Sequence, residues 1–482
     1  MSIKEYPDMN PYADGTNSIG SLEKAWAEIH GKKIYGNEFC GTLKTIIDAL
    51  ATKAELATVE GEVAYANSPG YYCEDIPWTA DTDEGRTVLA SPNILWLNIA
   101  GKGHKLNEQV IFDIDNPASW DTKATLLERD TAYALDDYVY ETNGNDTYIY
   151  KCMTPGTTST LTPTLPTTID ATYNDGSVVW KCVANYAAGA NRAGKDFYLY
   201  ALYNADGLEP SFVISNSGLA PDKIGDTPYR KIGGFHCLCA TIGEDAPGGS
   251  DHALYGYEAG DILPMSVWDC WHRPVGDPEG YVYEPGHNIW VSIYGLSWTG
   301  SFGNTPEDLQ LVSVYGGEWA DGTSTEKFHC SKFDQVLGRQ HQRLLYKREF
   351  VNASIGSNQG TNIYGSADPG TTGGHKDTAG KRMVSNIGCE DMCGDHYQWG
   401  AEYGACSTSG SYGAGYDAND KYVGGQIYGT EYRVLLGGRW TNGVACGSRC
   451  AAWNDGSLAL SASYGARGAS EPVHRNAGTY YA

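Results

Sequence analysis

The chain has 482 residues, which is too many for one compact core, so we expect about two to four domains. Its net charge of −25 makes nucleic acid and anionic membranes poor partners, because such a surface repels phosphate groups. The aromatic residues are 35 Tyr and 13 Trp but only 9 Phe, beside 60 Gly. This composition fits recognition loops and fits a β-rich protein equally well.

The first residues, MSIKEYPDMNPYADG, have neither the basic region nor the apolar core of a signal peptide. No stretch of the sequence reaches the apolar length of a membrane span, so membrane insertion is not expected. We therefore expect the protein to fold in a cytoplasm.

We expect residues 1–66 to form an attachment and trimerisation segment. Within 41–66, Leu43, Ile47, Leu50 and Ala54 recur at steps of four and three, as on one face of a helix. The helix has few other apolar residues, and so thin a stripe suits packing against copies of itself. A homotrimeric stem is the favoured interpretation, and a helix lying on the next domain is the alternative.

We expect residues 67–215 to form a β-rich spacer or accessory domain that is similar to a β-sandwich. YVYETNGNDTYIYKC (138–152) and GSVVWKC (176–182) alternate in side-chain type with period two between turn residues. Two strands ending in YKC and WKC indicate one small sandwich or barrel, with 197–207 as its closing strand. Exposed aromatic residues on such a module could bind carbohydrate, but a spacer role is favoured.

Residues 216–482 are dense in Gly, Trp and Tyr, with short apparent strands. The spacing of apolar residues predicts one helix over 333–353. The irregular stretch 356–382 follows, and loops of that length are usually functional or clamped. Farther on, four ionisable residues lie in one stretch without an evident nucleophile: Glu390, Asp391, Asp395 and His396. Such groups more often form a solvated loop or a calcium site than a catalytic centre, so we expect no catalytic residues and no cofactor beyond a structural calcium ion.

The thirteen cysteines are an odd number and do not indicate a disulfide framework. Three pairs are closely spaced: Cys237 with Cys239, Cys389 with Cys393, and Cys446 with Cys450. The last two pairs have a spacing that zinc sites use, but no His accompanies them at ligand spacing. Buried thiols or late-forming disulfides are favoured, and no metal site is assigned to them.

Two stretches alternate in side-chain type, 439–445 and SLALSASYG (457–465). The positions expected to pack are Trp440, Asn442 and Val444 in the first stretch, and Leu458, Leu460 and Ala462 in the second. If both stretches are extended, one face packs and the other remains uncommitted. Trp440 and Trp453 would then anchor a surface whose outer side chains can change without disturbing the packing, as recognition requires. The alternative is an ordinary sheet edge with a solvated face.

The segment GGRW, followed by GSRCAAWNDG and GARG, resembles the C-terminal diversity segment of phage major tropism determinants. Four upstream motifs resemble the same family in the same order: RKIGGFHCLC (230–239), SVWDCWHRP (266–274), EGYVYEPGHNIWVSIY (279–294) and SNIGCEDMCGDHYQW (385–399). Members of that family are tail-fibre receptor-binding proteins whose C-type lectin fold is varied by a diversity-generating retroelement. The resemblance implies a C-type lectin-like (formylglycine-generating-enzyme-like) α+β domain over 216–482, in a chain that is mainly β with some α.

The resemblance also implies roles for residues of the segment 437–468. The variable, receptor-facing positions are Arg439, Thr441, Gly443, Ala445, Ala452, Asn454, Asp455, Ala459, Ser461, Ser463 and Tyr464. The scaffold positions are Gly437, Gly438, Trp440, Gly447, Ser448, Arg449, Trp453, Gly465, Arg467 and Gly468. Among the variable residues, Arg439 and Tyr464 are expected to contribute most, because of their residue type. Cys446 and Cys450 lie between framework positions, and either a disulfide or simple packing would explain them.

The implied function is binding without chemistry, by a homotrimeric tail-fibre protein of the phage virion. Its partners would be a host cell-surface receptor, protein or glycan, and other tail or baseplate proteins, and several weak sites would gain from avidity. One alternative is a carbohydrate-binding or structural virion protein in which the middle domain binds. Another is a non-phage binding protein varied by the same system. A formylglycine-generating-type oxidase is disfavoured, because Cys446 and Cys450 sit unlike that enzyme's cysteine pair.

Overall fold

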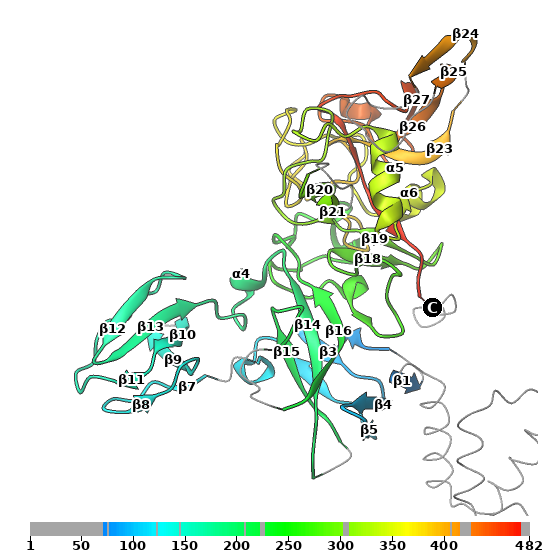
Figure 1. Cartoon of the computed structure of the whole chain (residues 1–482). Coiled ribbons are helices and arrows are strands. Elements are labelled where there is room, and N and C mark those ends of the chain that lie inside the picture. The colour runs from blue at the N-terminus through cyan, green and yellow to red at the C-terminus, as the bar shows by residue number, and fades with distance from the viewer. Residues whose placement is uncertain are drawn as a thin grey trace, which may run out of the picture. The chain divides into compact units, whose positions relative to one another are not determined.

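The computed structural model describes residues 71–74, 77–121, 124–143, 146–206, 209–221, 227–301, 308–404, 407–414 and 426–473 (Figure 1). The helix expected within 41–66 and the whole segment 1–66 lie outside these residues. The chain divides into two units, Met1–Tyr72 and Cys73–Ala482. The second unit contains nearly all of the elements described below. Among the described residues, no helix is both long enough and apolar enough to cross a membrane.

Strands dominate the described residues, so the prediction of a mainly β chain with some α is confirmed. Two three-stranded sheets come first in the chain. One has the order β1(Tyr71–Glu74), β4(Ile94–Ile99), β5(Lys102–Leu106), and the other β2(Thr79–Ala80), β3(Val88–Ala90), β6(Ile111–Asp113). A short 3-10 helix, η1(Pro117–Ser119), follows them and begins with Asn116 as its cap.

The next sheet has five strands in the order β12(Thr172–Asp175), β13(Val178–Val183), β10(Asp146–Thr154), β9(Tyr138–Asn143), β7(Thr125–Leu126). A two-stranded sheet of β11(Gly156–Thr157) and β8(Ala132–Tyr133) accompanies it. Alternate residues of β13 are buried, and they enclose a small core that includes Tyr150 and Trp180. The segments that end in YKC and WKC are strands, as the period-two pattern predicted, and the structure makes them neighbours, with Cys152 paired to Trp180.

A four-stranded sheet follows in the order β15(Ser211–Ser215), β14(Asp196–Leu202), β16(Tyr229–His236), β17(Trp268–Asp269). The expectation that 197–207 closes the sheet of β10 and β13 is therefore wrong. β14 is buried along almost its whole length and lies between β15 and β16, with which it forms antiparallel pairs. This sheet also runs across the expected domain boundary at 215/216, so the boundary does not separate two sheets. The short helix α4(Gly189–Arg192) precedes β14.

The C-terminal part contains two further four-stranded sheets and two hairpins. One sheet has the order β18(Tyr281–Glu284), β19(Ile289–Ser292), β29(Gly468–Ser470), β22(Arg343–Leu344), and the other β27(Ala451–Gly456), β26(Tyr432–Leu436), β23(Tyr397–Tyr403), β28(Tyr464–Ala466). The hairpins are β20(Leu296–Thr299) with β21(Gln310–Ser313), and β24(Ser407–Ala414) with β25(Gln426–Thr430). Three 3-10 helices, η2(Gly249–Asp251), η3(Pro264–Ser266) and η5(Gly443–Ala445), lie between strands.

Where one helix was expected over 333–353, the structure has two helices, α5(Cys330–Arg339) and α6(Lys347–Ala353). The chain between them turns at His341, whose φ is 59°, and then forms β22. Apolar spacing does not reveal this break, because Leu344 packs into a core as a strand residue instead of a helix residue.

The sheet of β23, β26, β27 and β28 lies between two hydrophobic cores. Leu435 belongs to a core with Phe333 and Leu337 of α5, whereas Val434 belongs to a core with Phe350 of α6. Figure 1 shows α6 beside β23 and β26, and the three elements are in contact. Both faces of β26 are therefore fixed by packing, because successive strand residues point to opposite sides.

The long stretch 356–382 is clamped. Isolated β-bridges join Ile363 to Asp377 and Lys376 to Arg382. The hydroxyl of Thr361 also donates a hydrogen bond to Asp377 Oδ2 over 2.7 Å. The stretch therefore carries a fixed conformation without being helix or strand.

Candidate functional site

The segment 437–468 connects the two edges of one sheet. It leaves β26 at Leu436, passes through η5, forms the edge strand β27, crosses a turn at 457–463, and forms the opposite edge strand β28. β26 and β27 are antiparallel, whereas β28 is parallel to β23. The segment therefore lies at the rim of a sheet that two cores hold rigid.

Two glycines fix the way the segment leaves β26. Gly437 and Gly438 have φ values of 83° and 85°, a region that side chains other than Gly rarely adopt. A Cβ at Gly437 would lie 2.6 Å from the carbonyl oxygen of Met392, and one at Gly438 would lie 3.0 Å from Cys446 Sγ. These positions are therefore restricted to glycine by both conformation and space.

Four of the expected variable residues form a hydrogen-bonded group, which we call the Arg439 cluster: Arg439, Thr441, Ser461 and Ser463. Arg439 Nε donates to Thr441 Oγ1 over 3.1 Å, and Arg439 Nη1 donates to Ser463 Oγ over 3.2 Å. The hydroxyls of Ser461 and Ser463 are 3.0 Å apart. Side chains from both ends of the segment therefore meet at one place.

Tyr464 lies next to this cluster and joins it to β27. Its hydroxyl donates to Asp455 Oδ1 over 3.0 Å, and its ring meets the edge of Trp399 at 5.4 Å between centroids. Burial, and then the neighbouring Asp455 carboxylate, raises the pKa of Tyr464 to about 12. The phenol is therefore protonated at neutral pH and remains a hydrogen-bond donor.

The eleven expected variable residues are not all on the surface. Thr441, Ala445 and Asn454 are exposed, whereas Ser463 is 1 % exposed. The other seven are partly buried: Arg439, Gly443, Ala452, Asp455, Ala459, Ser461 and Tyr464. Of these, Ala452, Ala459 and Tyr464 pack against the core that contains Trp399.

The alternation expected for this segment is wrong at two places. Residues 443–445 form the 3-10 helix η5, and 457–463 form turns, so neither stretch is an extended strand. Val444, placed by alternation on the packed face, is 91 % exposed, and Leu460 is 47 % exposed. The dipeptide Asn442-Gly443 is a turn signal in the sequence that could have revealed the first break. Val444 is therefore a surface residue that the alternation argument missed.

The two tryptophans differ in their environments. Trp440 is partly buried; its backbone N–H donates to the carbonyl oxygen of Asp395 over 2.8 Å, and its ring meets His396 edge-on at 4.9 Å. His396 in turn stacks on Trp319 with ring centroids 4.2 Å apart. These contacts hold Trp440 against the interior, and its role as an anchor stays a prediction.

Trp453, by contrast, is 41 % exposed, so its expected role as an anchor is not supported. The pairing of β26 with β27 is irregular here: Arg433 pairs with Asp455 and Leu435 with Ala452, which leaves two residues of β27 opposite one of β26. This bulge turns both Trp453 and Asn454 outward. Ala452, the preceding residue, packs inward instead.

The remaining scaffold residues divide into a buried and an exposed group. Arg467 is 1 % exposed, and its guanidinium donates to the carbonyl oxygens of Ser292 and Ile293, both at 2.6 Å. Added Cβ atoms at Gly465 and Gly468 would meet Trp319 and Tyr281. Near the other end, Ser448 N donates to Gln359 Oε1 over 2.9 Å, beside the buried Gly447, whereas Arg449 is exposed.

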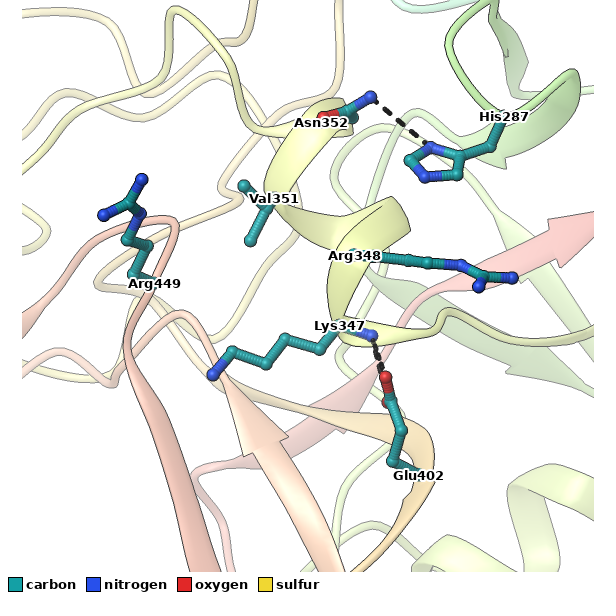
Figure 2. A pocket seen from close by; sticks show the side chains of 7 residues that line it. All are labelled: His287, Lys347, Arg348, Val351, Asn352, Glu402 and Arg449. Carbon is teal, nitrogen blue, oxygen red and sulfur yellow. Dashed lines mark hydrogen bonds between the residues drawn. The ribbon is translucent and has the colours of Figure 1, made fainter.

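A hollow of about 640 Å³ lies beside this segment (Figure 2). Its lining residues are His287, Lys347, Arg348, Val351, Asn352, Glu402 and Arg449. Both oxygens of Glu402 accept hydrogen bonds from the backbone N–H of Lys347, at 2.7 and 2.9 Å. The Lys347 ammonium lies 5.8 Å from the ring centroid of Trp453. The hollow therefore gathers three positive side chains in a protein of strongly negative net charge.

Burial sets the state of the cysteines. Of the eleven in the described residues, all are buried except the partly buried Cys270 and Cys450. Burial raises the pKa of Cys446 to about 11, with Cys450 adding to the shift, and the thiol donates to the carbonyl oxygen of Arg439. Simple packing therefore accounts for Cys446.

The stretch Glu390–His396 is not a solvated loop. Glu390, Asp391, Asp395 and His396 are all buried, each at most 1 % exposed. Glu390 forms an ion pair with Arg382 at 2.7 Å, and His396 Nδ1 lies 3.0 Å from Asp395 Oδ1. The first of the two expected alternatives, a solvated loop, is therefore wrong.

Residues 172–269 match the family model described as Mtd second domain. The resemblance to major tropism determinants is confirmed. The match begins upstream of the first motif quoted from the sequence, at 230–239, and it crosses the expected boundary at 215/216. No curated protein matches the chain.

Three solved structures of major tropism determinants are similar to the chain. The U1 variant is 21 % identical with a TM-score of 0.45, and the match covers 83 % of this chain and 95 % of that one. The I1 variant is 21 % identical with a TM-score of 0.46, covering 83 % and 96 %. The P3c variant is 20 % identical with a TM-score of 0.45, covering 83 % and 95 %.

Proposed function

We propose that the protein is a receptor-binding protein of a phage tail fibre, which recognises the host cell surface through the segment 437–468. The observation that carries the proposal is the Arg439 cluster, in which side chains from two distant parts of the segment meet through direct hydrogen bonds. The protein would act by binding alone, as a component of the virion and without chemistry.

The rigidity of the frame supports this function. Loops that become ordered only on binding reduce affinity, because their lost freedom subtracts from the contact energy. Here Gly437 and Gly438 fix one end of the segment, Trp440 is held against His396, and Arg467 ties β28 to β19. The surface would therefore be preorganised for a partner.

The exposure of the side chains revises the set of proposed contacts. Thr441, Ala445 and Asn454 are exposed, and Arg439 and Tyr464 are partly accessible beside them. Two exposed apolar residues, Val444 and Trp453, belong to the proposed surface as well. Ser463 is buried and would act by holding Arg439 in place instead of touching the receptor.

The basic hollow adds a second proposed contact. Lys347, Arg348 and Arg449 line the hollow, and Figure 2 shows Lys347 and Arg348 extending to opposite sides of α6. Carboxylate or phosphate groups on a bacterial surface carry the complementary charge. We therefore propose that an acidic group of the receptor occupies the hollow.

The segment 1–66 is proposed as the trimeric stem and attachment region, with 67–215 as a spacer and 216–482 as a C-type lectin-like binding region. Three copies per fibre would multiply a weak single-site affinity. We do not propose carbohydrate binding by the module of β7 to β13. In its described part, the exposed large apolar residues are aliphatic, whereas stacking on a sugar needs an aromatic face: Leu126, Leu135, Met153, Leu161 and Ile169.

The full chain, coated on fluorescent beads and presented to a panel of bacterial isolates, tests the proposal. Some isolate of the panel should bind beads that carry the unmodified chain. We expect Arg439→Ala and Tyr464→Ala each to weaken binding to that isolate by roughly 30-fold, as for contacts at the centre of an interface. Leu219→Ala is the control, since Leu219 is 93 % exposed outside the segment. Equal binding by all variants would refute the proposed surface.

The coding DNA offers a separate test of diversification. If the segment is varied by a retroelement, a near-copy of the DNA for 437–468 lies close by, differs mainly at adenines, and accompanies a reverse transcriptase gene. A fixed receptor-binding protein would lack this copy and still bind cells.

A further inference from the structure

Three side chains outside the proposed receptor surface converge in the interior. His375, Asp391 and Asp395 each place one potential ligand atom within 4.8 Å of the other two. Both carboxylates are fully buried, whereas the side chain of His375 is 19 % exposed. The three come from the clamped stretch 356–382 and from the stretch that leads into β23. The structure thus brings them together from different segments.

The hydrogen bonds of this group leave two oxygens unpartnered. Asp391 Oδ2 accepts from Gly373 N over 2.7 Å and lies 2.9 Å from His375 Nδ1. Asp395 Oδ1 lies 3.0 Å from His396 Nδ1. Asp391 Oδ1 and Asp395 Oδ2 are buried and have no hydrogen-bond partner. Buried polar atoms are almost always paired, so these two oxygens indicate a missing partner.

The local charges point to the kind of partner. Two buried guanidinium groups are nearby. Both oxygens of Glu390 accept from Arg382 Nη2, at 2.7 and 3.0 Å, and Arg467 donates to the carbonyl oxygens of Ser292, Ile293 and Glu390. His375 faces Asp391 directly, and Asp395 faces His396, the imidazole held between Trp319 and Trp440. The hydrogen bonds of both guanidinium groups therefore go to other acceptors, and a positively charged ligand would be a suitable partner for the two free oxygens.

We propose that His375, Asp391 and Asp395 bind one divalent metal ion of the class that accepts mixed nitrogen and oxygen ligands, such as Mn²⁺ or Zn²⁺. An imidazole together with two carboxylates suits these ions, whereas Ca²⁺ takes oxygen ligands. Water would complete the coordination, and the partly exposed His375 provides the route of entry. The cysteine pairs do not take part, since the three ligands include no thiol.

The location gives the ion a structural role. The carbonyl oxygen of Asp395 accepts from Trp440 N, and Asp395 forms a β-bridge with Arg439. An ion on the Asp395 carboxylate would connect the clamped stretch 356–382 to the base of the segment 437–468. The ion would stabilise the fold there whether or not the segment binds a receptor.

The test uses the purified full chain, first treated with a chelator and then equilibrated with Mn²⁺, Zn²⁺ or Ca²⁺ separately. Mn²⁺ is the principal probe, because it has little affinity for the many buried thiols and its binding is read by electron paramagnetic resonance. We expect about one Mn²⁺ per chain and a higher melting temperature with Mn²⁺ than after chelation. Asp391→Asn and His375→Gln should each lower Mn²⁺ affinity at least about tenfold and remove the thermal shift.

Asp196→Asn is the matched control. Asp196 also faces a buried imidazole, with Oδ1 3.0 Å from His236 Nδ1, but lies outside the group of three ligands. This variant should bind Mn²⁺ like the unmodified chain. If Asp391→Asn fails to fold, His375→Gln still tests the proposal, because His375 is partly exposed. Absence of Mn²⁺ and Zn²⁺ uptake, uptake of Ca²⁺ alone, or unchanged uptake by folded His375→Gln would each overturn the proposal.

Discussion

The guanidinium of Arg439 donates a hydrogen bond to the buried hydroxyl of Ser463 over 3.2 Å, across 24 residues of chain. The bond joins the loop that follows β26 to the turn that precedes β28. Because Ser463 is 1 % exposed, its side chain can position Arg439 but cannot itself form a broad contact with a partner.

Ser463→Ala therefore separates positioning from contact. We expect the variant to bind cells more weakly than the unmodified chain but more strongly than Arg439→Ala, because the arginine remains and loses only one of its supports. The loss of one hydrogen bond should lower the free energy of unfolding by about 1 kcal/mol. Bead binding and urea unfolding measure the two effects, and a Ser463→Ala variant weaker than Arg439→Ala would contradict this division of roles.

Gly437→Ala should destabilise the protein through both strain and collision. An alanine at a positive φ costs about 1–2 kcal/mol, and its Cβ would also lie 2.6 Å from the carbonyl oxygen of Met392. Gly365→Ala is a matched control, since Gly365 has the same φ of 83° and no atom within 4 Å of the added Cβ. Chemical unfolding should show the larger loss for Gly437→Ala, and equal losses would mean that the collision is relieved.

Trp453→Ala should lower the free energy of unfolding by about 1 kcal/mol or less, because the ring is 41 % exposed on a bulge. Trp399→Ala, at the 1 % exposed centre of the α5 core, should cost about 3–5 kcal/mol. Thermal unfolding of the two variants tests whether Trp453 is a surface residue instead of an anchor. A large loss for Trp453→Ala would restore its role as an anchor.

Acid should destabilise the fold through His272. Burial lowers the pKa of His272 to about 4, whereas an unfolded histidine titrates near 6.5. The folded state therefore favours the neutral imidazole. The contribution of His272 to the free energy of unfolding, up to about 3 kcal/mol, is complete above pH 6.5 and is lost as the pH falls from 6.5 towards 4. The free energy of unfolding should differ less between pH 7.5 and pH 5 for His272→Phe than for the unmodified chain. An unchanged difference would exclude His272 as its source.

Charge reversal in the basic hollow should weaken cell binding. Lys347→Glu and Arg449→Glu remove positive charge from the site and add negative charge, so we expect weaker binding in each, together with a reduced dependence on salt concentration. Lys195→Glu is the control, because it changes an exposed cation elsewhere in the chain. Arg129→Glu is less suitable, because Arg129 pairs with the buried Asp175. Binding of the Lys347→Glu variant at the level of Lys195→Glu would exclude the hollow as a contact.

The sequence predicts strands best where alternation is strong. The runs 138–152 and 176–182 alternate with period two, and the structure has strands in both, although their register, with Cys152 opposite Trp180, comes from the structure alone. The sequence predicts poorly which sheet a fully buried strand such as β14 enters, because a continuous apolar run contains no information about its neighbours.

The candidate site shows the same limit at the level of single residues. The motif residues Gly437, Gly438 and Trp440 have closely packed or hydrogen-bonded environments. The bulge in β27 and the turn at η5, however, reverse the side on which Trp453 and Val444 lie. A one-residue irregularity is set by tertiary contacts, so periodicity cannot reveal it.

The inward packing of Ala452 and Ala459 limits how freely the segment could be randomised. Both methyl groups lie against the core around Trp399, where a bulky replacement would have to displace Phe or Leu side chains. Thr441, Ala445 and Asn454 face solvent and carry no such size limit. Variants with bulky residues at the codons of Ala452 and Ala459 would thus be removed by misfolding before any selection by a receptor, and the usable diversity would come from the solvent-facing positions.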